Sequence, residues 1–178
     1  NFKTVLSNPS FKKAFSNTIH IWLFNFVPQI GLALLLTAWF TDKRYHIRGE
    51  GLFKVLFYMP NIITAATIAI LFNALLGYPM GPVNDIFMRL GISKEPINFL
   101  VDKSVARGTV EFIQFWMWYG YTMIILISGV MGINPELFES AEVDGANRIQ
   151  TFFYITIPNL KTILLFTLVK IGRASCRE

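Results

Sequence analysis

Three long stretches of the chain carry no charged side chain. They cover residues 14–41, 55–84 and 112–135, and contain 28, 30 and 24 residues. A helix needs about 20 mainly apolar residues to cross a hydrocarbon core that is roughly 30 Å thick, whereas a soluble domain of this size would place charges in each stretch. The pattern therefore predicts three membrane-spanning helices, which we place at about residues 16–40, 51–77 and 105–131.

A fourth apolar stretch follows Pro158 and is much shorter. Its uncharged part, residues 162–169, would form about 12 Å of helix, which is less than half of a bilayer. We interpret it as a partial fourth span, in a chain that is truncated at both ends. Residues 172–178 are polar and show no pattern, so we interpret them as a tail of artificial or assembly origin that follows a partial membrane domain at residues 1–171. The alternative is a short native polar C-terminus.

Shorter elements are predicted around these spans. Asn8 can cap a helix that begins at the proline directly after it. Pro60 predicts a kink or break about two residues earlier in the second span. Residues 84–91 predict a short amphipathic helix, with Asn84 as its N-cap and Gly91 as its end.

The number of crossings divides the polar segments between the two sides of the membrane. Residues 41–50 and 132–158 must share one side, and residues 1–15 and 78–104 must share the other. Lysine and arginine are distributed over both sides, so the positive-inside rule alone does not give the orientation.

The segment between the third and fourth stretches is patterned like a folded element. Residues 134–136 (Asn-Pro-Glu) supply an N-cap, a proline at the first helical position and an acid at the positive end of the helix dipole. We expect one short helix to Val143, a break at residues 144–145, and a second helix that reaches Pro158. Such a bent, rigid projection is suited to docking in a partner's groove. The alternative is an interfacial helical hairpin that only packs against the rest of the protein and binds no partner.

The spacing in this insert closely resembles the EAA signature of permeases from binding-protein-dependent ABC transporters. That signature reads E-A-A, three residues, G, nine residues, I-x-L-P. Residues 139–141 (Glu-Ser-Ala), Gly145 and residues 155–158 (Ile-Thr-Ile-Pro) have the same spacing, with Ser140 and Ile157 as conservative departures. The form PELFESAEVDGA is most similar to the sugar-uptake branch, and the resemblance extends over most of the chain.

The resemblance implies an all-α, polytopic transmembrane helix bundle in the bacterial cell (inner) membrane. The insert would be a cytoplasmic helix-turn-helix that couples the permease to an ATPase, which places residues 78–104 outside. The implied partners are a second permease subunit, an ABC ATPase dimer that binds ATP and magnesium, an extracytoplasmic solute-binding protein and membrane lipid. The permease itself would hold no cofactor and catalyse no reaction. The residues that the resemblance assigns to ATPase coupling are Glu139, Ser140, Ala141, Asp144, Gly145, Ile155 and Pro158.

Polar and aromatic side chains inside the spans are weaker candidates for a substrate route. Polar groups at bilayer depth usually face other helices or a water-lined path, and aromatic rings can stack on the apolar faces of sugars. The alternative for the aromatic residues is an interfacial belt or helix packing. The candidates are Asn61, Gln114, Trp116, Trp118 and Tyr119.

Other functions have less support in the sequence. The net charge is +5 without a basic stripe, which does not indicate nucleic-acid binding, and one cysteine, Cys176, gives neither a disulfide nor metal-ligand spacing. No Walker-type phosphate loop is present, so the energy must come from a partner. An intramembrane enzyme would need a paired nucleophile and base or a metal-ligand set.

An ion-coupled secondary transporter is the competing class, and it predicts an acidic residue inside the membrane. The candidate, Glu111, lies near the end of a span, where Arg107 could pair with it four residues away on the same helix. His20 lies near the outer end of the first span, and snorkelling to the interface explains a lone histidine there.

Overall fold

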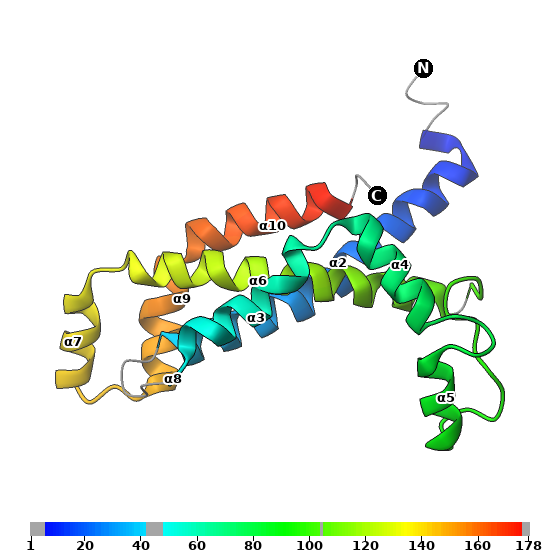
Figure 1. Cartoon of the computed structure of the whole chain (residues 1–178). Coiled ribbons are helices and arrows are strands. Elements are labelled where there is room, and N and C mark those ends of the chain that lie inside the picture. Colours follow the sequence, from blue (N-terminus) through cyan, green and yellow to red (C-terminus); the bar gives the residue numbers. More distant parts are fainter. Residues whose placement is uncertain (1–5, 42–47, 104, 176–178) are drawn as a thin grey trace.

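The computed structural model of this chain is a bundle of helices. It describes residues 6–41, 48–103 and 105–175, without the side chains of 171–175, and these residues contain helices and loops but no strand. The bundle is elongated, with the helices of the predicted insert at one end and the short helix α5 at the other (Figure 1). This arrangement confirms the all-α class and the separation of the two polar segments. Cys176 and most of the 41–50 loop lie outside the described residues.

Two helices are each long and apolar enough to cross a membrane, namely α2 (Pro9–Phe40) and α6 (Ala106–Met131). The side chain of Asn8 caps α2 by accepting a hydrogen bond of 2.9 Å from the Ser10 N–H, as predicted. The helix then continues without a break through Pro28. The helix predicted to begin after Asn8 and the first predicted span are therefore one continuous helix, α2.

The second predicted span is broken in a different place from the one expected. Helix α3 (Glu50–Ile62) holds Pro60 inside it, and α4 (Ala65–Leu75) leaves at an angle of 93°. Ile63 is extended, and the Thr64 hydroxyl caps α4 by accepting a hydrogen bond from the Thr67 N–H at 3.3 Å. The predicted break two residues before Pro60 was wrong: the helix ends after Ile62, where Ile63 is extended and Thr64 begins the next helix as its N-cap.

The number of spans depends on how bent helices are counted. The two straight helices become up to four spans if α3 with α4, and residues 148–159 with 161–170, each form one crossing. The last pair ends in α10 (Lys161–Ser175), whose backbone continues past the predicted boundary at residue 172. Helix α10 packs on both α2 and α6.

The short helix α5 (Pro82–Arg89) confirms one part of its prediction and corrects another. Gly91 follows α5 with a left-handed backbone conformation, φ of +70°, and so ends the helix as expected. The N-cap is Gly81, whereas Asn84 lies within the helix and is fully buried. Its side chain donates to the Ile97 carbonyl at 3.0 Å and accepts from the Ile97 N–H at 2.9 Å. Asn84 therefore holds the following loop against α5 and does not cap the helix.

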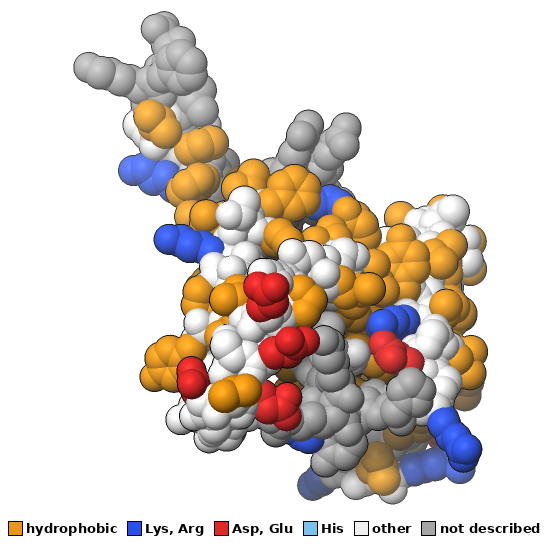
Figure 2. Space-filling view, turned by 90° about the vertical axis from the view of Figure 1, so that its left-hand side faces the viewer, with side chains coloured by type: hydrophobic (Ala, Val, Ile, Leu, Met, Phe, Trp, Pro, Cys, Tyr) orange, Lys and Arg blue, Asp and Glu red, His pale blue; other side chains and the backbone are white. Residues whose placement is uncertain are grey.

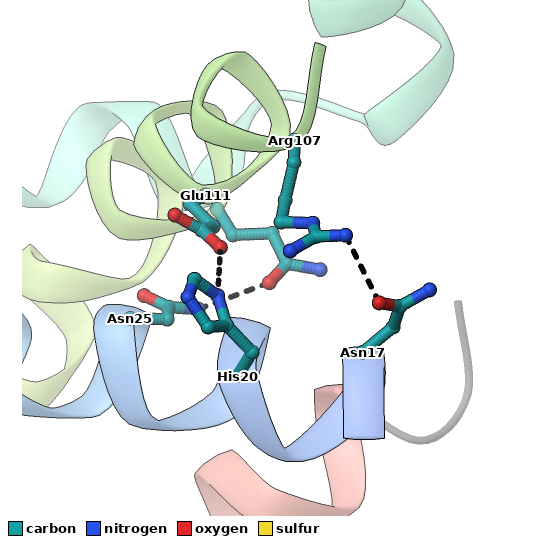
Figure 3. Close-up of polar contacts among 6 residues, drawn as sticks. Asn17, His20, Asn25, Arg107 and Glu111 are labelled. Carbon is teal, nitrogen blue, oxygen red and sulfur yellow. Dashed lines mark hydrogen bonds and ion pairs between the residues drawn. The ribbon is translucent and has the colours of Figure 1, made fainter. Parts of the chain in front are cut away.

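A row of polar contacts joins α2 to α6 along their length. Arg107 donates to the Asn17 amide oxygen at 2.9 Å, and His20 lies 3.3 Å from a Glu111 carboxylate oxygen (Figure 3). Both side chains of the predicted Arg107–Glu111 pair thus turn to the neighbouring helix instead. Further along, Asn25 donates to the Gln114 amide oxygen at 3.0 Å. Buried amides inside an apolar bundle need such partners, because lipid offers none.

Close backbone approach also fixes α6 within the bundle. Gly120 lies against α3, where a Cβ atom would be 1.9 Å from the Phe57 carbonyl oxygen. Towards the other end, a Cβ on Gly129 would meet the side chains of Leu160 and Ile163 at 2.7 and 2.4 Å. Leu160 is completely buried in the main apolar core, which also contains Met123 and Leu126. Helix α6 is therefore the element that the other helices contact most closely.

Candidate functional site

The insert after α6 begins with a helix that its own sequence defines. Helix α7 spans Pro135–Val143, as predicted. Asn134 caps it by accepting a hydrogen bond of 3.1 Å from the Glu136 N–H, and its amide donates to the Glu136 carboxylate at 3.1 Å. Because these contacts are local, the sequence itself fixes where α7 begins.

The turn after α7 requires glycine. Gly145 has φ of +76°, where side chains are disfavoured. Its N–H bonds to the Glu142 carbonyl at 3.1 Å, and the Ala146 N–H reaches back to the Ala141 carbonyl at 2.9 Å. These two bonds form a Schellman motif, which satisfies the last carbonyl groups of α7. The predicted break at residues 144–145 is therefore confirmed together with its physical reason.

A capping box starts the second half of the insert. Asn147 accepts from the Gln150 N–H at 2.9 Å, while its own N–H donates to the Gln150 side chain at 2.8 Å. Helix α8 (Arg148–Thr151) then widens into a π-helical turn, η1 (Phe152–Thr156), before α9 (Ile157–Asn159). Pro158 accounts for the wide turn, since its ring cannot pack against the carbonyl of residue 154 in a regular helix.

The insert ends in a corner that is anchored on the bundle. The chain bends by 66° between residues 148–159 and 161–170. Leu160 lies at this corner and packs beside Gly129 of α6. On the other side of the insert, Phe138 of α7 packs against the same apolar core. A force on the insert would therefore reach α6 directly through packed side chains.

The outer surface of the insert is both acidic and apolar. Figure 2 looks onto this end of the molecule and shows acidic side chains gathered among hydrophobic ones. The acidic residues of α7 and its turn are all exposed: Glu136, Glu139, Glu142 and Asp144. Apolar side chains beside the glycine turn are also open, with Val143 86% and Ile149 69% exposed. This combination provides charge and apolar area for contact with another protein.

The structure brings the predicted coupling residues together in this one hairpin. Most of them are exposed, namely Glu139, Ser140, Asp144, Gly145 and Pro158. Ala141 is buried and Ile155 is half-buried. The set thus divides into residues that can touch a partner and residues that fix the shape of the hairpin, while their role in coupling stays a prediction.

The candidates for a substrate route do not form one site. Asn61 donates to the Met117 carbonyl at 3.3 Å, and Trp116 packs edge-on against Phe72. Tyr119 contacts rings on α3 and α6. Gln114 is buried against α2 and also borders a cavity of about 360 Å³ between α4 and α6, whose walls are apolar apart from Gln114 and Asn73. Helix packing therefore accounts for the positions of Trp116 and Tyr119, whereas Gln114 also lines the cavity.

Trp118 lies in a cluster that includes two residues missed from the sequence. Its ring is 5.9 Å from that of Tyr121, and the Lys170 ammonium nitrogen is 6.0 Å from its centre. Lys170 also bonds to the Tyr121 hydroxyl. The signal that could have identified this cluster is a lysine inside an apolar helix, which we had interpreted as the end of the fourth stretch.

These features define a multi-pass helical membrane protein with a structured insert at one end of the bundle. Residues 6–170 match the family described as the binding-protein-dependent transport system inner membrane component. The chain therefore belongs to this family, which confirms the resemblance carried by the insert.

Sequence relatives of the chain include named sugar permeases. The lactose transport system permease protein LacF of Rhizobium radiobacter is 30% identical over 169 residues, which are 95% of this chain and 56% of LacF. The arabinooligosaccharides transport system permease protein AraP of Bacillus subtilis (strain 168) is 28% identical over 166 residues, which are 93% of this chain and 52% of AraP. The chain thus spans about half the length of these relatives.

Solved structures agree with this fold. A chain from the crystal structure of a bacterial ABC transporter involved in the import of the acidic polysaccharide alginate matches with a TM-score of 0.82 and 26% identity. The match covers 96% of this chain and 58% of the other. A crystal structure of the alginate transporter in complex with an alginate pentasaccharide-bound periplasmic protein matches with the same TM-score.

Proposed function

We propose that this protein is a membrane-spanning permease subunit of an ATP-driven ABC importer for sugars or oligosaccharides. The observation that carries the proposal is the insert: a self-capped, bent pair of short helices, exposed on its outer side and packed on α6 through Leu160. Family membership and relatives named as sugar permeases support it. The bacterial cell membrane is the proposed location.

The insert would act as the coupling element. Closure of two ATPase subunits around ATP and magnesium would move the exposed hairpin formed by α7 and α8. Because both helices are capped by their own residues, the hairpin can transmit movement without unfolding. The contact of Leu160 with Gly129 would pass the movement to α6, so the bundle would change between inward-facing and outward-facing states.

The remaining partners follow from the same proposal. A second permease subunit would complete the route across the membrane, and surrounding lipid would cover the apolar outer faces. An extracytoplasmic solute-binding protein would deliver the substrate to the end that carries α5, opposite the insert (Figure 1). The family's dependence on a binding protein, and the alginate transporter's complex with a periplasmic protein, support this partner.

The competing class, an ion-coupled secondary transporter, has weaker support. Its candidate acid, Glu111, lies in the second turn of α6 and contacts His20 on α2. The pairing gives Glu111 a structural reason to be there, and membership in a binding-protein-dependent transport family favours the importer.

A charge reversal on the insert tests the proposed coupling. The full-length protein would be assembled with its partner subunits in liposomes, and both uptake and ATP hydrolysis would be measured. We expect Glu139→Lys to lower ATP-dependent uptake at least about tenfold, because it replaces an anion with a cation on the acidic surface that would dock on the ATPase. The amount of ATP hydrolysed per sugar transported should rise. Gly145→Pro should uncouple in the same way by destroying the turn.

A matched control separates docking from general damage. Glu95→Lys makes the same change in the loop after α5, at the opposite end of the bundle. Its effect should be confined to that end, so association with the ATPase should equal that of the unmodified protein. Normal uptake by Glu139→Lys in an intact complex would show that the insert does not carry the coupling.

A further inference from the structure

The break between α3 and α4 leaves a groove on one side of α6. Helix α3 lies so close to α6 that the Phe57 carbonyl is beside Gly120. At Ile63 and Thr64 the chain then turns through 93°, so α4 cannot follow α6 as closely as α3 does. The space between α4 and α6 is the cavity of about 360 Å³, which we call the α4–α6 groove.

The α4–α6 groove is almost entirely apolar and opens to one side. Ile68 and Phe72 of α4 are buried along it. Asn73 and Gln114 are the polar side chains among its lining residues, and the Gln114 amide oxygen already accepts a hydrogen bond from Asn25 at 3.0 Å. The lining residues that are exposed form the open side: Ala65, Ala69, Asn73, Leu100 and Val110. A ligand can therefore enter from outside the described bundle.

Helix α6 places the groove at the depth of one lipid leaflet. Its lining residues run from Val110 to Met117, which lie four and eleven residues after Ala106, where the helix begins. At 1.5 Å per residue they are about 6 and 17 Å from that end of a helix about 39 Å long, and so in the half nearer α5 (Figure 1). One leaflet contributes about 15 Å to a hydrocarbon core of roughly 30 Å. The acyl chains of that leaflet are therefore level with the groove.

The apolar surface of the groove continues onto the outside of α4. Ile70 and Leu71 are 72% and 40% exposed there. In a membrane-spanning bundle, such side chains are covered either by acyl chains or by another helix. The size of the groove distinguishes between these two occupants.

The groove is too small for a helix but large enough for an acyl chain. Two turns of a helix about 10 Å wide occupy roughly 850 Å³, which is more than twice the space available. An engineered apolar cavity of about 150 Å³ holds one benzene molecule, so 360 Å³ has room for roughly fourteen carbon atoms. That is close to the size of one fatty acyl chain.

The walls of the groove also disfavour a sugar. Hydroxyl groups that leave water need hydrogen-bond partners, because a buried polar group without a partner is costly. Asn73 and Gln114 offer too few polar atoms for the hydroxyl groups of one hexose ring, and Gln114 is already bonded to Asn25. An acyl chain needs no such partners and gains contact with Ile68 and Phe72.

We propose that the α4–α6 groove is a binding site for one acyl chain of a membrane phospholipid. The chain enters past the exposed Ala69 and Val110 and lies against the buried face of α4, while its headgroup stays at the membrane surface on the side of α5. The bound chain fills the space left by the break after α3. Lipid thereby supports α4 against α6 where direct helix packing does not.

A photoreactive phospholipid tests this site on the full-length protein, assembled with its partner subunits in nanodiscs. The lipid is a phosphatidylcholine with a diazirine in the middle of one acyl chain, and mass spectrometry identifies the labelled residues. We expect labelling of Met117 in the groove, and Ala69→Phe should lower it at least about fivefold by filling the groove. Ala66→Phe is the matched control, because Ala66 is an exposed alanine of α4 that is not among the lining residues. It should leave the labelling unchanged. Ala69→Leu, a smaller change, should have an intermediate effect.

Three results would overturn the inference. The first is an unmodified protein without label on Met117, or an equal loss of label in Ala69→Phe and Ala66→Phe when both complexes assemble normally. The second is displacement of the label by millimolar galactotriose, which would assign the groove to the sugar route. The third is a crosslink to protein instead of lipid from a photoreactive benzoylphenylalanine in place of Val110, which would show that another protein segment covers the groove.

Discussion

The insert and the α2–α6 interface are built in opposite ways. The hydrogen bonds of the caps and the glycine turn in the insert join residues no more than five positions apart, as in the Asn147–Gln150 capping box and the bond from Ala146 to Ala141. The polar bonds of the interface join residues about ninety positions apart, such as Asn25 with Gln114, whose side chains are both buried. One region is therefore specified by local sequence and the other by tertiary packing.

This difference suits the two regions to different tasks. An element that holds its own shape can be pushed by a partner and move as a unit. An interface of interlocked polar pairs keeps two helices in register while the elements around them move. Substitutions should therefore damage the interface through stability and the insert through local order.

The largest effect is expected where α6 touches α3. Gly120→Leu would place a Cβ 1.9 Å from the Phe57 carbonyl oxygen, and a backbone atom cannot turn aside as a side-chain end can. We expect a loss of about 3 kcal/mol in the free energy of unfolding, seen as a lower Tm of the purified full-length protein. Gly31→Leu is the control, because nothing lies within 4 Å of a Cβ at Gly31 on α2. Equal Tm values for both variants would contradict the close approach.

A smaller effect is expected in the polar interface itself. Gln29 donates to the Thr122 hydroxyl at 2.7 Å, while its own amide oxygen has no hydrogen-bond partner in the described structure. Thr122→Val alone would deprive a buried amide of its best acceptor and should cost about 1 kcal/mol. The double variant with Gln29→Leu removes both groups and should be more stable than Thr122→Val alone. Tm values of the single and double variants check this order, and a double variant that is the least stable would contradict it.

The same contrast explains which features could be predicted from the sequence. The bounds of α7 and the glycine turn were predicted because the caps at Asn134 and Gly145 act within a few residues. The role of Asn84 was not, because its partner Ile97 is thirteen residues away across a loop. The pairing of Glu111 with His20, 91 residues apart, depends on the packing of α2 on α6.

The candidate site shows the same division between local and distant signals. The spacing of residues 139–158 identified the family, and the comparisons confirm it. Lys170 was missed because a lysine at the end of an apolar stretch suggests the end of a span. Only the continuation of α10 through Ser175, and the contact with Tyr121, place it inside a helix against α6.

The smallest effect tests whether the two halves of the insert are independent. Asn147→Ala removes the capping box of α8 and should cost about 1 kcal/mol locally, which corresponds to roughly fivefold faster hydrogen exchange at the Gln150 and Thr151 amides. The Tm of the whole protein should not change, because Asn147 and Gln150 are exposed and their capping box lies outside the buried core.

Asn134→Ala is the matched control, since it removes the equivalent cap from α7. If each helix is specified by its own cap, each substitution should accelerate exchange only in its own helix. Faster exchange in both helices after either change would mean that the hairpin folds as one cooperative unit. In that case the Schellman turn at Gly145, and not the separate caps, would hold the two helices of the insert together. The stability of the whole insert would then depend on that one glycine.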